Sequence, residues 1–155
     1  MRYLSKIEVR AWPFIGWVAM AIGTVFVNRS DKASRSQARQ QLGQVARFPP
    51  IVLYPEGGIG PANSLQPFRY GAFEIAIEQG IPYLVCAINY SRADVIVWGE
   101  GESLIECLWR LACFPGPMDA SVTPLKIIAP QPGDDPKVLA VEAHHTIAVA
   151  LQVSP

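Results

Sequence analysis

Leu53-Tyr-Pro-Glu-Gly-Gly-Ile-Gly60 joins an apolar strand to a loop that is rich in proline and glycine and carries one acid, Glu56. Three glycines within four positions, Gly57, Gly58 and Gly60, let backbone amides approach a bound group without interference from a Cβ atom. A concavity lined by amides suits a phosphate. The loop is therefore predicted to hold an anionic ligand.

Strands and helices alternate on both sides of this loop. Apolar runs such as Ile51–Tyr54 and Tyr83–Ile88 are typical of strands whose two faces are both buried, as in parallel sheets. The alternation predicts an α/β fold with a largely parallel mixed sheet flanked by helices. The expected strands cover residues 2–5, 24–28, 51–54 and 82–89, and the expected helices cover 13–22, 31–46 and 70–79.

The pattern is less regular beyond Tyr90. Two loops, Pro115–Pro117 and Pro130–Gly133, separate elements without marking a domain boundary, so residues 1–155 are expected to form a single domain. The expected elements here are a strand at 94–98, an amphipathic helix at 103–114, a strand at 121–129 and a helix at 136–153.

Charge is unevenly distributed along the chain. Residues 1–47 hold eight Lys or Arg and two acids, a net charge of +6, and the neutral total leaves −6 in the remainder. This asymmetry favours an anionic membrane surface or a phosphorylated substrate, and the lack of a basic motif interleaved with aromatics argues against nucleic acid. A hydrophobic content of 50% with 17% charged residues fits a protein that rests on a membrane or holds an acyl-chain groove.

Localisation is predicted from cysteine usage and from the N-terminal residues. Cys86, Cys107 and Cys113 lie in apolar runs without metal-ligand or redox spacing, so they are expected to be reduced core residues in the cytoplasm. No secretory signal is expected at Met1. The uncharged stretch Ala11–Asn28 is of marginal length for a membrane span, and a short helix followed by a buried strand explains it better. The alternatives are a true span and interfacial contact of residues 12–17.

Three blocks of the sequence together resemble the glycerolipid acyltransferase family, whose best-known members acylate lysophosphatidic acid. The blocks are Gly23-Thr-Val-Phe-Val-Asn-Arg29, the loop at Pro55–Gly58 with Pro67-Phe-Arg-Tyr-Gly-Ala-Phe73, and the strand Ile81–Ile88 that a proline leads. Their order and spacing match the family over roughly residues 2 to 90. The resemblance implies a glycerol-3-phosphate acyltransferase-like fold with a substrate site at Gly23, Phe26, Arg29, Glu56, Gly57, Gly58 and Arg69.

The resemblance implies that Arg29 holds the phosphate of the acceptor, whereas position alone favours a surface arginine beside Asp31. Glu56 would repel a phosphate, so it is expected to orient a basic partner or to hold loop amides. Arg69, before a helix, suits a second anionic contact, such as the carrier of the acyl donor, or is simply solvated. The family usually has threonine where this chain has Gly58, so a hydroxyl donor is missing.

A second cationic group lies on the helix expected at residues 31–46. Lys32, Arg35 and Arg39 fall at helical spacing, which places three cations on one face. They suit anionic head groups, although a solvated polar face is the commoner outcome.

The catalytic block of the family is missing from this chain. The general base of the family is a histidine paired with an aspartate as His-x-x-x-x-Asp. The histidines here are His144 and His145, and Val149 and Ala150 stand five positions beyond them. The motif would precede Met1, because Arg2–Lys6 resembles the strand that follows it. The chain is thus expected to be a partial domain that lacks the N-terminal strand-helix unit, with packing or surface roles for both histidines.

By resemblance, the function is acyl transfer from acyl-CoA or acyl carrier protein to a lysophospholipid or glycerol-phosphate hydroxyl, without metal or cofactor. The protein is expected to be peripheral on the cytoplasmic side of the membrane. For want of the dyad, no residue of this chain is predicted to be catalytic, and the chain alone is expected to be inactive. The alternatives are a non-catalytic lipid- or phosphate-binding module and an unrelated α/β domain.

Overall fold

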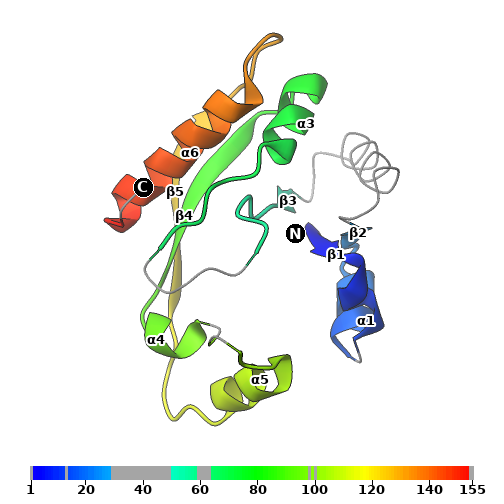
Figure 1. The fold of residues 1–155 in the computed structure, drawn as a ribbon, viewed down its shortest axis with the longest axis vertical. Coiled ribbons are helices and arrows are strands. Elements are labelled where there is room, and N and C mark those ends of the chain that lie inside the picture. The colour runs from blue at the N-terminus through cyan, green and yellow to red at the C-terminus, as the bar shows by residue number, and fades with distance from the viewer. Residues whose placement is uncertain are drawn as a thin grey trace. The chain divides into compact units, whose positions relative to one another are not determined.

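The computed structural model describes residues 2–12, 14–28, 50–58, 64–97, 99 and 101–153. They belong to two compact units, Met1–Tyr54 and Pro55–Pro155, which are described separately (Figure 1). The helix predicted at residues 31–46, with Lys32, Arg35 and Arg39, lies outside the described residues, as do Arg29 and Gly60. One domain over residues 1–155 stays a prediction.

The first unit contains the parallel strand pairs that the sequence predicts. The central strand β1 pairs with β2 in the register Leu4↔Val25 and with β3 in the register Arg2↔Ile51. Strand order is β2-β1-β3. The elements are β1 (Arg2–Lys6), the 3-10 helix η1 (Ile7–Ala11), α1 (Ile15–Ala21), β2 (Val25–Val27) and β3 (Ile51–Val52).

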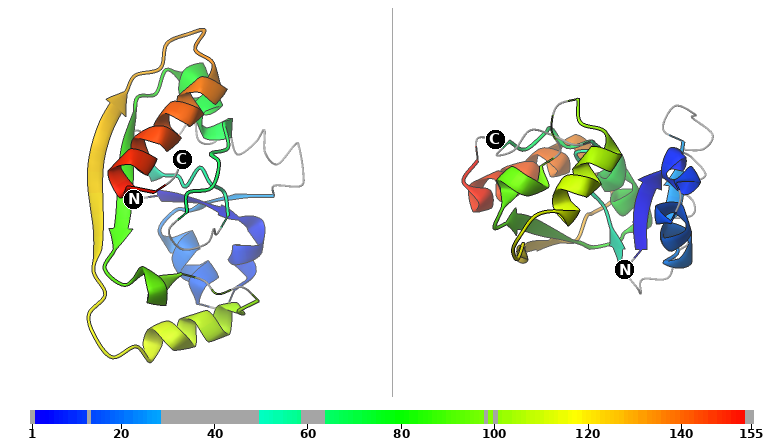
Figure 2. Two further views of the ribbon diagram at one scale, coloured as in Figure 1. Left: turned by 60° about the vertical axis from the view of Figure 1, so that its left-hand side comes forward. Right: turned by 90° about the horizontal axis from the view of Figure 1, so that it is seen from below.

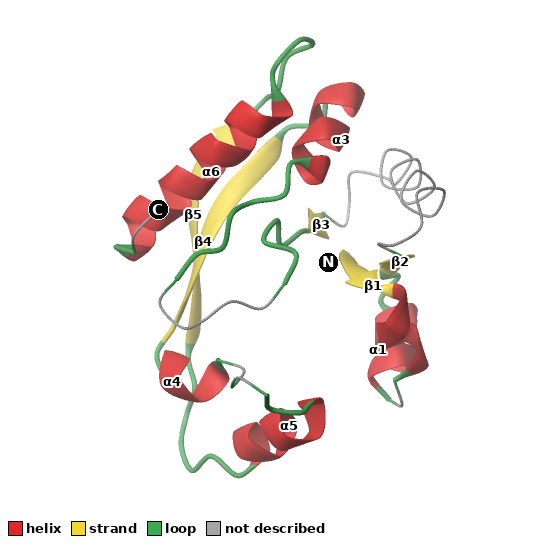
Figure 3. Cartoon of the chain, viewed as in Figure 1, coloured by secondary structure: helices red, strands yellow, loops and turns green. Residues whose placement is uncertain are grey.

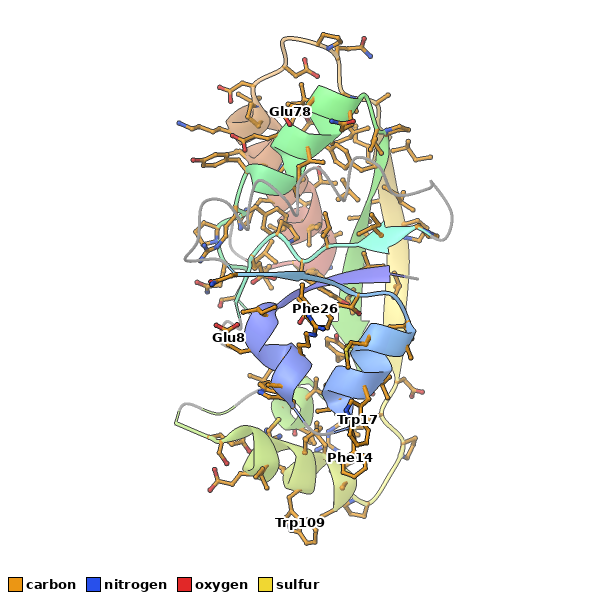
Figure 4. All side chains as sticks on the ribbon, turned by 90° about the vertical axis from the view of Figure 1, so that its right-hand side faces the viewer. Glu8, Phe14, Trp17, Phe26, Glu78 and Trp109 are labelled. Carbon is orange, nitrogen blue, oxygen red and sulfur yellow. The ribbon has the colours of Figure 1, made fainter. Side chains whose placement is uncertain are left out.

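Helix α1 packs closely on η1 through the buried Gly16, whose N–H donates to the carbonyl oxygen of Trp12 at 2.9 Å. The opposite side of α1 is apolar and exposed. Phe14 and Trp17 are 73% and 66% exposed, and their rings meet edge to face at 5.7 Å (Figure 4). Among the described residues, no helix has the length and apolar character that a membrane span requires.

The second unit is built on an antiparallel strand pair. Strand β4 pairs with β5 from Tyr83↔Ile128 to Tyr90↔Ala120, with an irregularity between Val85 and Cys86. Helices α6 and α3 pack together beside this ribbon (Figures 2 and 3). The elements are α3 (Gly71–Gln79), β4 (Tyr83–Tyr90), α4 (Ala93–Ile96), α5 (Leu104–Ala112), β5 (Ala120–Ile128) and α6 (Pro136–Leu151).

The core of the second unit joins α3, α6 and the strand pair. Phe73 from α3 meets Tyr83 of β4 edge to face at 5.5 Å. Phe68, which precedes α3, packs against the same cluster and so ties the loop to it. The buried members are Phe73, Val85, Ile128, Leu139, Ala140 and Ala143.

Three expectations need correction. Parallel pairing is found in the first unit, but β4 pairs antiparallel with β5, so the described pairings form two sheets rather than one largely parallel sheet. The strand predicted at residues 94–98 is wrong at residues 94–96, which belong to α4. A short apolar run does not by itself distinguish a strand from a helix. Cys107 is buried as expected, but Cys113, at the end of α5, is exposed.

Arg110 fastens α5 to α4 and to the segment that follows it. Its guanidinium donates to the carbonyl oxygens of Val95 and Val97 and to both carboxylate oxygens of Glu102, the latter at 2.8 and 2.7 Å. Ser103 and Glu106 form a capping box at the start of the helix, as its predicted amphipathic pattern allows. Trp109 points outward from α5 and is 72% exposed (Figure 4).

Acid should weaken the second unit through Glu102. The hydrogen bonds from Arg110 and from the Gly99 amide lower the pKa of Glu102 from its usual 4.5 to about 2. A lowered pKa means that the folded state favours the ionised carboxylate, so this stabilisation is complete above pH 4.5 and is lost as pH falls towards 2. Urea unfolding across this pH window should show a smaller loss of stability in Glu102→Gln than in the wild type. Equal pH slopes would contradict this assignment.

Gly16→Ala should destabilise the first unit. A Cβ atom at residue 16 would overlap the carbonyl oxygen of Arg10 and lie 3.0 Å from that of Val9. Because both neighbours are backbone, the clash should cost about 1–3 kcal/mol of unfolding free energy or more. Val18→Ala is the control on the exposed side of α1 and should change stability by about 0.5 kcal/mol or less. Chemical denaturation followed by tryptophan fluorescence measures both.

Candidate functional site

Two hydrogen bonds close the loop that the sequence singles out. The amide N–H of Gln66 donates to Oε2 of Glu56 at 3.0 Å, ten residues back along the chain. The amide N–H of Arg69 donates to the carbonyl oxygen of Pro55 at 2.9 Å. These bonds bring the Pro-Glu-Gly segment beside the Phe-Arg segment. Holding loop amides is one of the two roles predicted for Glu56.

The two described glycines of the loop differ. Gly57 has φ of 69°, in the left-handed region where a Cβ atom is unfavourable. Among the described residues, a Cβ atom added at Gly58 would meet no other atom within 4 Å. Gly57 is therefore required by the turn, whereas Gly58 has room for the threonine that the family usually carries.

Arg69 leads into α3 with an exposed side chain. The N-cap of α3, Tyr70, offers no side-chain hydrogen bond to the first helical amides. Lys137, at the start of α6, places its ammonium 5.8 Å from the centroid of the Tyr70 ring. Two cations thus flank the N-terminus of α3. The anionic contact predicted for Arg69 stays a prediction.

His144 connects α6 to the same loop. Its Nε2 atom lies 3.4 Å from the carbonyl oxygen of Leu65, and its ring meets Phe68 edge to face at 5.0 Å. His145 is exposed. His144 thus packs against Phe68 and His145 lies at the surface, but the sequence did not indicate that His144 reaches a residue 79 positions earlier.

A pocket of 240 Å³ opens beside this contact. The described residues that line it have apolar side chains, apart from the imidazole of His144. The residues come from the loop and from α6: Leu65, Pro67, Phe68, Ala140, Val141 and His144. The loop and the first half of α6 therefore form one local surface.

The phenol of Tyr83 is a titratable group in this part of the second unit whose pKa is clearly shifted. Burial, with smaller contributions from Glu142 and Asp134, raises the pKa of Tyr83 to about 12, so its phenol stays protonated at neutral pH. Within the described ranges, neither histidine hydrogen-bonds to a carboxylate, and no cluster of His, Cys, Asp or Glu is arranged to hold a metal ion.

The other predicted site residues belong to the first unit. Gly23 has φ of 73° in the turn before β2. Phe26 lies within β2 opposite Ser5 and is partly buried (Figure 4). Arg29 lies outside the described residues, so its approach to Gly57 and Gly58 stays a prediction.

The Acyltransferase family matches residues 1–89, more than half of the chain, and the chain belongs to this family. The match contains the glycine blocks, the closed loop and most of β4. The predicted family is confirmed.

Curated relatives include lipid acyltransferases from bacteria and mammals. The chain is 36% identical over 95 residues to the lyso-ornithine lipid O-acyltransferase of Pseudomonas aeruginosa, covering 61% of this chain and 37% of that protein. It is 29% identical to lysophosphatidylcholine acyltransferase 1 of Homo sapiens, and the match covers 97% of this chain and 29% of that protein. It is 27% identical to the 1-acyl-sn-glycerol-3-phosphate acyltransferase of Neisseria gonorrhoeae, and the match covers 70% of this chain and 45% of that protein. The chain thus spans less than half of each relative.

One solved structure shares the fold. It is the 1-acyl-sn-glycerophosphate acyltransferase PlsC of Thermotoga maritima, with a TM-score of 0.67 over 97% of this chain and 55% of that one. Sequence identity is 20%, so the likeness concerns the fold.

Alanine at the two loop glycines should have opposite effects. Gly57→Ala forces a Cβ atom into the left-handed region and should cost about 1–2 kcal/mol of stability. Gly58→Ala meets open space and should be neutral or stabilising by up to about 1 kcal/mol. Urea unfolding of the matched pair provides the test. Equal losses would show that the backbone at Gly58 is also restricted.

Proposed function

We propose that this chain carries the acceptor-binding part of a glycerolipid acyltransferase. The reaction moves an acyl group from acyl-CoA or acyl carrier protein to the free hydroxyl of a lysophospholipid or related glycerol phosphate. The observation that carries the proposal is the closed Glu56–Arg69 loop within a chain segment that belongs to the Acyltransferase family. The names of the relatives support a lipid acceptor with one free hydroxyl.

In this proposal the residues of the chain bind and orient. Glu56 holds the loop closed so that the amides around Gly57 and Gly58 face the acceptor phosphate, and Arg29 grips that phosphate. Arg69 takes a second anionic group, such as the phosphates of the acyl donor. The acceptor hydroxyl attacks the thioester carbon, the carbon–sulfur bond breaks, and the thiol leaves with the proton. The thioester already activates the acyl group, so the proposed reaction uses no metal or organic cofactor.

The base for the hydroxyl proton is not among the residues of this chain, because neither His144 nor His145 begins a His-x-x-x-x-Asp motif. We infer that the 155 residues bind acceptor with turnover lowered by several orders of magnitude. The same sequence observation favours a second candidate, a non-catalytic module that binds lipid or phosphate.

The proposed place of the protein is the cytoplasmic surface of a membrane, where lysophospholipids reside. The exposed apolar side of α1, with Phe14 and Trp17, supports this proposal. Tryptophan is favoured at membrane–water interfaces because its ring is apolar and its N–H is polar.

Vesicle binding tests the acceptor site. The 155-residue chain should co-sediment more with phosphatidylcholine vesicles that contain lysophosphatidic acid than with phosphatidylcholine alone. Arg29→Ala removes a charged contact to phosphate and should weaken this difference about tenfold or more. Arg10→Ala, at an exposed arginine outside the motifs, is the control and should bind as the wild type does.

Release of free CoA from acyl-CoA and lysophosphatidic acid separates the two candidates. An acyltransferase domain should turn over once a His-x-x-x-x-Asp unit of the family is joined to the N-terminus of the 155 residues, whereas a binding module should not. Binding that ignores lysophosphatidic acid, or that survives Arg29→Ala in full, would refute the acceptor site.

A further inference from the structure

One peptide group of the loop is held at both of its polar ends. The carbonyl oxygen of Leu65 and the N–H of Gln66 belong to the same planar peptide unit. The imidazole of His144 lies 3.4 Å from that carbonyl oxygen, and the Glu56 carboxylate accepts from that N–H at 3.0 Å. Because the unit is planar and trans, turning its carbonyl away from His144 also turns its N–H away from Glu56.

The contact bears on which ring nitrogen of His144 carries a proton. A carbonyl oxygen only accepts hydrogen bonds, so the bond requires a proton on Nε2. The edge-to-face contact with Phe68 at 5.0 Å sets the plane of the imidazole. Phe68 is itself packed against the core cluster. The donor is thus aimed from a helix that the core holds in place.

We propose that His144 is a positioning residue for the acceptor loop: it donates from Nε2 to Leu65 and thereby orients the Leu65–Gln66 peptide towards Glu56. The hydrogen bond to Leu65 thus influences Glu56 through the single planar peptide group between Leu65 and Gln66. Its consequence for acceptor affinity rests on the proposed function, whereas its consequence for the loop does not. His144 acts on the shape of the site and exchanges no proton with substrate.

A role in packing alone predicts different effects of substitution at His144. If His144 only filled space beside Phe68, phenylalanine would replace it well. If the Nε2 donor matters, His144→Phe should lose the orientation of the Leu65–Gln66 peptide. His144→Gln, whose amide places a donor near the position of Nε2, should keep it. His145→Phe, on the exposed neighbour, controls for the added apolar surface.

Nitrogen NMR of the wild-type chain provides the first measurement. The neutral ring of His144 should show the spectrum of the tautomer with its proton on Nε2. The tautomer with the proton on Nδ1 would overturn the proposal, and this result needs no variant to fold.

Amide hydrogen exchange provides the second measurement. In His144→Phe the exchange of the Gln66 amide should rise about fivefold, as expected for losing one neutral hydrogen bond. It should return to the wild-type rate in His144→Gln and remain unchanged in His145→Phe. Amides of the β4–β5 pair report whether the variants keep their fold. Unchanged exchange at Gln66 in a folded His144→Phe would overturn the proposal.

Binding of lysophosphatidic acid in vesicles then separates the effect of His144 on the loop from its effect on acceptor affinity. His144→Phe should weaken the binding about fivefold, in step with the exchange rate. If the wild type does not respond to lysophosphatidic acid, the proposed function fails, while the exchange result still supports or overturns the role of His144 in the loop.

Discussion

The candidate site depends on the hydrogen bond from the Gln66 amide to the Glu56 carboxylate. This charge-assisted bond is 3.0 Å long and joins two residues that lie ten positions apart in the sequence. The backbone hydrogen bond from Arg69 to Pro55 lies beside it. Together they bring the Pro-Glu-Gly turn against the entrance to α3. An acid in a loop that we propose binds an anion is thereby explained, because its negative charge is engaged by an amide of the loop itself.

Contacts within the second unit support this loop. Phe68 anchors the loop in the cluster formed by α3, α6 and the strand pair, and His144 approaches it from α6. A long helix at the end of the chain therefore stabilises a motif near its middle. The family match ends at residue 89, so His144 lies beyond it, and its contribution belongs to the architecture rather than to the motif.

The accuracy of the sequence predictions followed the strength of the local signals. Helices α3, α5 and α6 were predicted within a few residues. Helix α5 has a strong amphipathic pattern and a capping box, α6 begins at a proline after Asp135, and α3 ends at Gly80 in the left-handed conformation. The run at residues 94–98 was misassigned as a strand because five residues carry no measurable period. The direction of β5 could not be predicted either, since an apolar run pairs as well in parallel as in antiparallel.

The family, the order of its motifs and the absence of a His-x-x-x-x-Asp pair follow from the linear chain, because they depend on residue identity and spacing alone. The partners of Glu56 and His144 do not, since these contacts join residues 10 and 79 positions apart. Such pairs form when helices and strands pack. Many chain paths satisfy the same hydrophobic pattern, and only the packed core selects the path that brings Leu65 to α6.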